Sequence, residues 1–127
     1  DFRVELGAEQ EAAIRKQIEE HTSEAARAAM QDAWRRLHEA ISHMGERLSQ
    51  PDAIFRDSLF GNVAELCDVL PRLNLAGDPN LDRMTDEIRK RVLTVTPQAV
   101  REDPTARQHA AAEVAKIENA LKGFYAP

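Results

Sequence analysis

The 127-residue sequence has a single cysteine, only 5% aromatic residues and no long run of apolar residues. Cys67 has no second cysteine to pair with, so an internal disulfide is excluded and a reducing, cytoplasmic compartment is favoured. No stretch approaches the length of about 18 apolar residues that a transmembrane helix needs, and no signal-peptide pattern is present. The chain opens with Asp1 rather than Met. We therefore expect a cytoplasmic protein without a membrane segment, and a sequence that is a fragment of a longer chain.

The charge balance argues against anionic partners. The net charge is −5, so the overall field repels a nucleic-acid backbone or an anionic membrane. There is no glycine-rich loop of the kind that holds phosphates, so the sequence offers no support for nucleotide binding. The abundant Ala, Glu, Arg and Leu favour helix at nearly every position. An all-α protein is the resulting prediction.

The longest predicted helix runs from about Ala8 to about Ser49 without a proline. From residue 30 its apolar residues alternate steps of four and three, which indicates a buried seam formed by Met30, Trp34, Leu37, Ile41, Met44 and Leu48. Upstream, a weaker stripe of Ile14, Ile18, Ala25 and Ala28 does not join that seam in register. We expect a bend, a break or a change of partner near residues 22–23, and residues 2–6, which alternate with period two, suggest a short strand or extended arm.

Prolines mark the starts of the remaining helices. Asp78-Pro79, Thr96-Pro97 and Asp103-Pro104 each place a capping side chain before a proline, and Pro51 indicates a further start. The predicted helices span about residues 51–70, 79–95 and 104–122, with a short turn of helix at 97–100. Gly123 suits a left-handed C-cap, after which Phe124 or Tyr125 folds back onto the last turn. Four main helices with short links predict one helical bundle domain over residues 1–127.

The stretch HEAISHMGE, residues 38–46, looks like the HExxH zinc motif but has the wrong spacing. His38 and His43 are five residues apart, which leaves their rings about 140° apart around a helix instead of about 40°. They cannot bind one metal ion without breaking the helix. Glu39 and His43 lie opposite the seam and are predicted to form a solvated surface pair.

The sequence contains no set of residues typical of another kind of enzyme active site. A di-iron bundle needs Glu-x-x-His pairs, and the sequence has none. Cys67 lies within an apolar arc, where a thiol is usually a small buried hydrophobe. We therefore expect a protein that is not an enzyme, with no catalytic or metal-binding residues and no cofactor.

Two further features each admit two interpretations. The basic residues Arg35, Arg36, Arg89, Lys90 and Arg91 are either a solvated face or phosphate contacts, and neighbouring acids favour the solvated face. The apolar loop of residues 73–81 is either a buried corner between helices or a docking surface. The buried corner is favoured.

Several short segments resemble a known group of proteins. These segments are Phe55-Arg56-Asp57-Ser58-Leu59, residues 65–74 (ELCDVLPRLN), Gly77-Asp78-Pro79, and Val100-Arg101-Glu102-Asp103-Pro104 with Arg107. Over about residues 51–125 they resemble the C-terminal half of a family of uncharacterised proteins encoded by tailed bacteriophages and integrative mobile elements. That family is often encoded near a MoxR-type AAA+ ATPase and a protein with a von Willebrand factor A domain. The resemblance implies a helical adaptor or substrate of such an ATPase system and supplies no catalytic residues.

The resulting expectation is a non-enzymatic helical module that binds a protein partner or a second copy of itself. A helix of about 40 residues spans about 60 Å, longer than the other predicted helices can cover, so part of its surface should be open to another chain. Ile14 and Ile18 are the residues expected to face that partner. The alternative is a nucleic-acid accessory protein of phage replication or recombination, which would use Arg35, Arg36, Arg89, Lys90 and Arg91.

Overall fold

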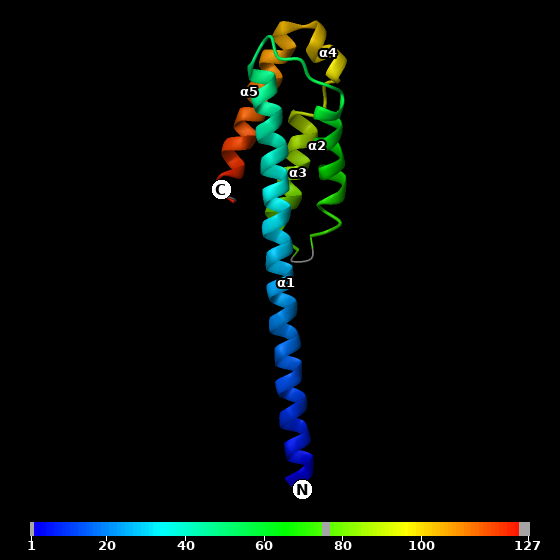
Figure 1. The fold of residues 1–127 in the computed structure, drawn as a ribbon, viewed down its shortest axis with the longest axis vertical. Coiled ribbons are helices and arrows are strands. Elements are labelled where there is room, and N and C mark those ends of the chain that lie inside the picture. Colours follow the sequence, from blue (N-terminus) through cyan, green and yellow to red (C-terminus); the bar gives the residue numbers. More distant parts are fainter. Residues whose placement is uncertain (1, 75–76, 125–127) are drawn as a thin grey trace.

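A computed structural model describes residues 2–74 and 77–124, and all of the regular structure in these ranges is helical. The elements in chain order are α1 (Phe2–Ser49), α2 (Ser58–Val69), α3 (Pro79–Arg91), α4 (Pro97–Glu102) and α5 (Pro104–Leu121). Figure 1 shows that α2 to α5 gather around one half of α1, while the other half of α1 extends away from them. The all-α bundle with a long N-terminal helix is confirmed. We call residues 30–74 and 77–124 the body and residues 2–29 the projecting half.

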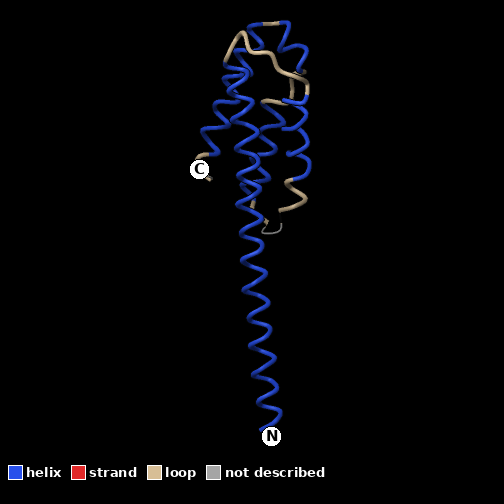
Figure 2. The backbone as a smooth tube through the Cα atoms, viewed as in Figure 1, coloured by secondary structure: helices blue, strands red, loops and turns tan. Residues whose placement is uncertain are grey.

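The helix α1 is continuous from Phe2 to Ser49, which corrects two predictions. Residues 2–6 are helical and form neither a strand nor an extended arm, and no break occurs at Thr22-Ser23 (Figure 2). Threonine and serine each cost only a few tenths of a kcal/mol in a helix interior, and the surrounding Ala, Glu, Gln and Arg favour helix. The loss of register lies between Ala28 and Met30 and reflects a change of environment, from solvent to the body, along one unbroken helix.

The second helix begins later than predicted. It starts at Ser58 instead of Pro51, and residues 50–57 form turns and loop that carry the chain around the end of α1. Ile54, which we assigned to the apolar face of that helix, lies in this loop with 87% of its surface exposed. Phe55 is buried, so one of the two large apolar residues of the loop anchors it and the other does not.

The remaining helix starts follow the capping prediction. Asp78, Thr96 and Asp103 accept hydrogen bonds from the backbone N–H groups of Asn80, Ala99 and Thr105, respectively, and a proline follows each cap. The ends are less well predicted: α3 stops at Arg91 although the apolar pattern continued to Val95, and α4 extends to Glu102. Val92 is nevertheless fully buried, because the turn after α3 keeps its side chain against the core.

The core lies between the second half of α1 and the other helices. Its α1 contribution is the predicted seam, with Trp34, Leu37, Ile41, Met44 and Leu48 all buried and Met30 partly buried against it. Helix α5 packs along α1, and a Cβ atom added at Gly45 would come within 3.2 Å of Val114 Cγ1 of α5. The seam therefore depends on a small residue at position 45 to seat α5.

The C-terminal end differs from the prediction in one respect. Gly77 has the only positive φ in the described residues, at 64°, so Gly123 is not a left-handed C-cap. Phe124 folds back, but onto α1, where its ring stacks on Trp34 with centroids 4.9 Å apart. Tyr125, the alternative residue for this contact, lies outside the described residues.

Candidate interaction surface

The projecting half of α1 lies in solvent along nearly its whole length. From Phe2 to Ala29 every residue is exposed except Ala26, which is half-buried, and this stretch spans about 42 Å. Ile14 and Ile18 are 57% and 60% exposed. Figure 1 shows no other helix beside this part of α1. The two isoleucines that the sequence assigned to a partner therefore lie where another chain can reach them.

The face that carries Ile14 and Ile18 points away from the bundle core. At 100° per residue, each isoleucine lies about 160° around the helix axis from Trp34, which is buried in the core. Within the body, the same face of α1 carries Glu39 and His43, and both are exposed. A helix docked on Ile14 and Ile18 would therefore not collide with the body of its own protomer.

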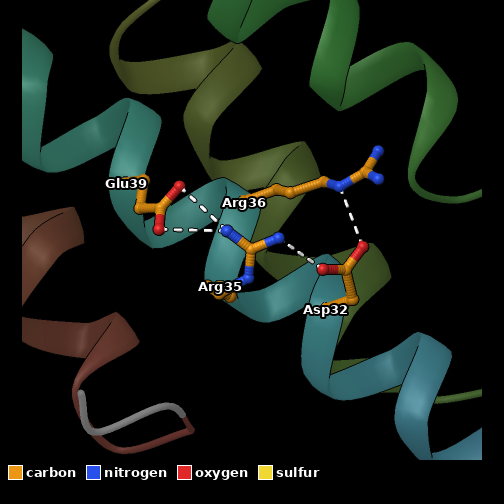
Figure 3. Close-up of polar contacts among 4 residues, drawn as sticks. All are labelled: Asp32, Arg35, Arg36 and Glu39. Atoms are coloured by element: carbon orange, nitrogen blue, oxygen red, sulfur yellow. Dashed lines mark hydrogen bonds and ion pairs between the residues drawn. The ribbon is translucent and has the colours of Figure 1, made fainter.

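A group of paired charges lies where the projecting half meets the body. Arg35 donates to Asp32 and, at 3.1 and 3.2 Å, to both oxygens of Glu39, and the Nε of Arg36 lies 2.9 Å from the second oxygen of Asp32 (Figure 3). The hydrogen bond from Arg35 lowers the pKa of Asp32, and the hydrogen bond to Asp32 raises the pKa of Arg35. Both residues stay ionised at neutral pH. Arg35 and Arg36 are thus engaged by acids on their own helix.

The three basic residues of α3 are paired in the same way. Arg89 reaches α2, where it donates to the Cys67 carbonyl and, at 3.0 Å, to the carboxylate of Asp68. Lys90 pairs with Asp86 at 2.7 Å and Arg91 with Glu87 at 2.8 Å. All five bases named for the nucleic-acid alternative therefore have a carboxylate partner within the described chain. Binding a phosphate backbone through them would require these pairs to be exchanged.

The residues of HEAISHMGE are spread around α1. Glu39 pairs with Arg35 instead of forming the predicted contact with His43, because both of its oxygens face the guanidinium. His38 is half-buried and His43 is exposed. Over residues 2–74 and 77–124, no three His, Cys, Asp or Glu side chains are grouped closely enough to hold a metal ion.

Cys67 has no exposed surface, as its apolar neighbours in the sequence predicted. Burial raises the pKa of its thiol to about 11. The side chain is therefore a neutral thiol at physiological pH, and its carbonyl, not its sulfur, makes the contact with Arg89.

Sequence reasoning missed a cluster at the end of the body away from the projecting half. The side chain of Arg107 closes the C-terminal end of α1: its Nη2 donates to the carbonyls of Arg47, Gln50 and Ala53 at 2.8, 2.7 and 2.8 Å, and its Nε donates to that of Leu48 at 3.3 Å. Arg47 and Leu48 lie in the last turn of α1, where carbonyls lack partners within the helix, and Gln50 and Ala53 lie in the loop that follows, so one cation joins the helix end to the loop.

A second arginine completes this cluster. Arg101 donates to the Phe55 carbonyl at 3.0 Å and pairs with Asp57 at 2.6 Å. The guanidinium carbons of Arg101 and Arg107 lie 4.8 and 5.2 Å from the centroid of the Phe55 ring. These residues fall in the segments that carry the family resemblance, and here they fix the loop between α1 and α2. The sequence from Arg101 to Arg107, which contains Pro104, has no pattern that predicts these contacts.

The apolar loop of residues 73–81 is closed by one side chain. The amide of Asn74 donates to the Asp78 carbonyl at 2.7 Å and accepts from the Asp78 N–H at 2.8 Å. Leu81 is fully buried, whereas Leu73 is 51% exposed, and Leu75 lies outside the described residues. The corner interpretation thus holds for Leu81 and not for Leu73.

Comparisons with known proteins identify no relative: no family model, curated protein or solved structure matches the chain. None of the helices in the described residues is both long and apolar enough to span a membrane.

Proposed function

We propose that this protein is a non-enzymatic helical interaction module, and that the projecting half of α1 presents the face of Ile14 and Ile18 to another protein chain. The observation that carries the proposal is the 57% and 60% exposure of these two isoleucines on a stretch of helix that projects about 42 Å from the body. Helices in water gain most of their stability by packing an apolar face. A partner would supply that packing for residues 2–29.

The cellular setting is part of the same proposal. The segments around Phe55, Arg101 and Arg107 support a protein of phage or mobile-element origin that acts as an adaptor or a substrate of a AAA+ ATPase system. In this arrangement the body is a rigid holder, since its arginine cluster fixes the end of α1, and the projecting half is the part that the partner binds.

Capture of the tagged protein from cells that carry its native element tests the proposal. The wild type is compared with an Ile14→Asp/Ile18→Asp variant and with an Ala12→Asp/Ser23→Asp control. The control adds the same charge to the same helix, but within about 40° of the direction of Trp34. Circular dichroism checks that all three proteins are equally helical.

The proposal predicts that a protein such as an AAA+ ATPase or a von Willebrand factor A domain protein is retained by the wild type and the control and lost from the Ile14/Ile18 variant. Equal retention by all three proteins would contradict it. Retention of nucleic acid that falls steeply with added salt would favour the accessory-protein alternative instead.

A further inference from the structure

The exposed stripe of the projecting half has the spacing of a coiled-coil seam. Steps of four and three connect Glu11, Ile14, Ile18 and His21, which places these residues at alternating a and d positions. The same steps continue to Val4 and Gly7 in one direction and to Ala25 and Ala28 in the other. All eight residues are exposed, so the seam is complete and uncovered from Val4 to Ala28.

The two polar residues in this seam decide between the possible orientations of a second copy. In a parallel pair each residue faces itself, so two Glu11 carboxylates would meet at one layer and two His21 rings at another. In an antiparallel pair centred near Lys16, Ile14 faces Ile18 of the second copy and Glu11 faces His21. A carboxylate opposite an imidazole forms a hydrogen bond or ion pair, whereas two carboxylates repel each other.

The outer layers and the bodies fit the antiparallel arrangement as well. Gly7 would face Ala25 and Val4 would face Ala28, so each outer layer contains at least one small residue, and the Ile14–Ile18 layers are the only ones that join two large apolar side chains. The seam ends at Ala28, just before Met30 enters the core of the body. The two bodies would therefore lie at opposite ends of the paired helices, clear of each other (Figure 1).

We propose that the face of Glu11, Ile14, Ile18 and His21 binds the same face of a second copy of this chain in antiparallel orientation, with Glu11 of each copy opposite His21 of the other. This inference rests on the proposed function, since it names the partner of the same surface. Arg15 flanks the seam, and its Nη2 lies 2.9 Å from Oε1 of Glu11 on the same helix.

Two substitutions at one position distinguish the orientations. Sedimentation equilibrium of the full chain is measured for the wild type, His21→Lys and His21→Glu. In the antiparallel pair residue 21 faces Glu11, so His21→Lys tightens self-association and His21→Glu weakens it, each by roughly threefold to tenfold for two symmetric contacts. In a parallel pair residue 21 faces itself, so both substitutions weaken self-association.

Cysteine cross-linking gives an independent readout in a Cys67→Ala background. Disulfides form only between cysteines whose Cα atoms lie within about 7 Å. An equimolar mixture of Ile14→Cys and Ile18→Cys chains is expected to give mostly the mixed disulfide, while each chain alone stays largely unlinked.

Three outcomes would each overturn the inference. They are disulfide formation within each variant alone, weaker self-association of both His21 variants, and a wild type that is monomeric at the highest concentration. A monomeric wild type that still loses a captured protein on Ile14→Asp/Ile18→Asp substitution would leave the proposed function standing.

Discussion

The two halves of α1 belong to one unbroken helix, yet they are stabilised in different ways. From Trp34 to Leu48 the apolar residues repeat at steps of three and four and are almost completely buried against α2, α3 and α5. From Phe2 to Ala29 the large apolar residues are sparser and all of them are exposed. Continuous helical geometry therefore does not imply uniform stability. The body holds its half of the helix by packing, while the projecting half is left with helix propensity until a partner binds.

The largest difference between the halves is expected from matched truncations. Leu37→Ala removes a side chain with no exposed surface and should lower the free energy of unfolding by about 2–5 kcal/mol. Ile18→Ala removes a side chain that is 60% exposed and should change the stability of the dilute monomer by less than about 0.5 kcal/mol. Urea denaturation at low protein concentration measures both, and similar costs for the two variants would contradict the division.

The arginine cap should have the next largest effect. Arg107→Ala removes the guanidinium that donates to the carbonyls of Arg47, Gln50 and Ala53, of which Gln50 still accepts from the Ala53 N–H, and should cost about 2–3 kcal/mol. Arg72→Ala, a control at an exposed arginine of the body, should cost less than about 0.5 kcal/mol. Thermal unfolding of the two variants provides the comparison, and equal melting temperatures would show that the cluster does not fix the end of α1.

The two glycines of α1 offer a matched test with opposite signs. Gly45→Leu forces side-chain atoms against Val114 and Glu118 of α5, and should destabilise the body by about 1–3 kcal/mol. A Cβ atom at Gly7 meets nothing within 4 Å, so Gly7→Ala should stabilise the helix of the projecting half by up to about 1 kcal/mol. The helix content of that half should rise accordingly. Circular dichroism at 222 nm and thermal unfolding separate the two effects. If Gly7→Ala destabilised the body, the stability of the body would depend on the projecting half, which would contradict the division of α1 into two separately stabilised halves.

The last predicted effect on stability comes from the thiol of Cys67, and it changes stability only at alkaline pH. Burial raises its pKa from 9.0 to about 11, so the folded state binds the proton more tightly than the unfolded state. This contribution to stability is complete below pH 9 and is lost as the pH rises to 11. Thiol labelling provides the check: Cys67 should react slowly at pH 8, whereas a cysteine placed at position 14 in a Cys67→Ala background should react rapidly. Rapid labelling of native Cys67 would contradict its burial.

Much of this structure could be predicted from local patterns. The seam of Trp34, Leu37, Ile41 and Met44 is correct because a long helix that buries one face must repeat at that spacing. The caps at Asp78, Thr96 and Asp103 are correct because a cap followed by proline is a local signal. In contrast, the start of α2 depends on how the chain turns around the end of α1, and this turn is held by Arg101 and Arg107, about 50 residues away in sequence. Contacts between residues so far apart in the sequence produce no repeating pattern from which they could be predicted.

The candidate surface, like the fold, could be predicted from the sequence only where a local pattern marks it. Ile14 and Ile18 could be singled out because their stripe does not join the core seam, and the structure leaves both exposed. Of the alternatives expected near residues 22–23, the break is wrong because α1 is continuous, whereas a change of packing partner does occur further along the helix, where α1 enters the body. Side-chain conformation decides which ion pairs form at Arg35, Arg36, Arg89, Lys90 and Arg91, so the exact partners could not be predicted from the sequence. The contact from Arg89 to Asp68 also joins two helices and depends on how they pack.

Hydrogen exchange measured at two protein concentrations tests the central claim most directly. The account predicts that backbone amides of residues 33–48 are strongly protected at both concentrations. Amides of residues 4–28 should exchange rapidly in dilute solution and become protected when the protein is concentrated. If residues 4–28 were as protected as the body at the highest dilution, the projecting half would be stable without a partner, and the division of α1 into a packed half and a binding half would be wrong.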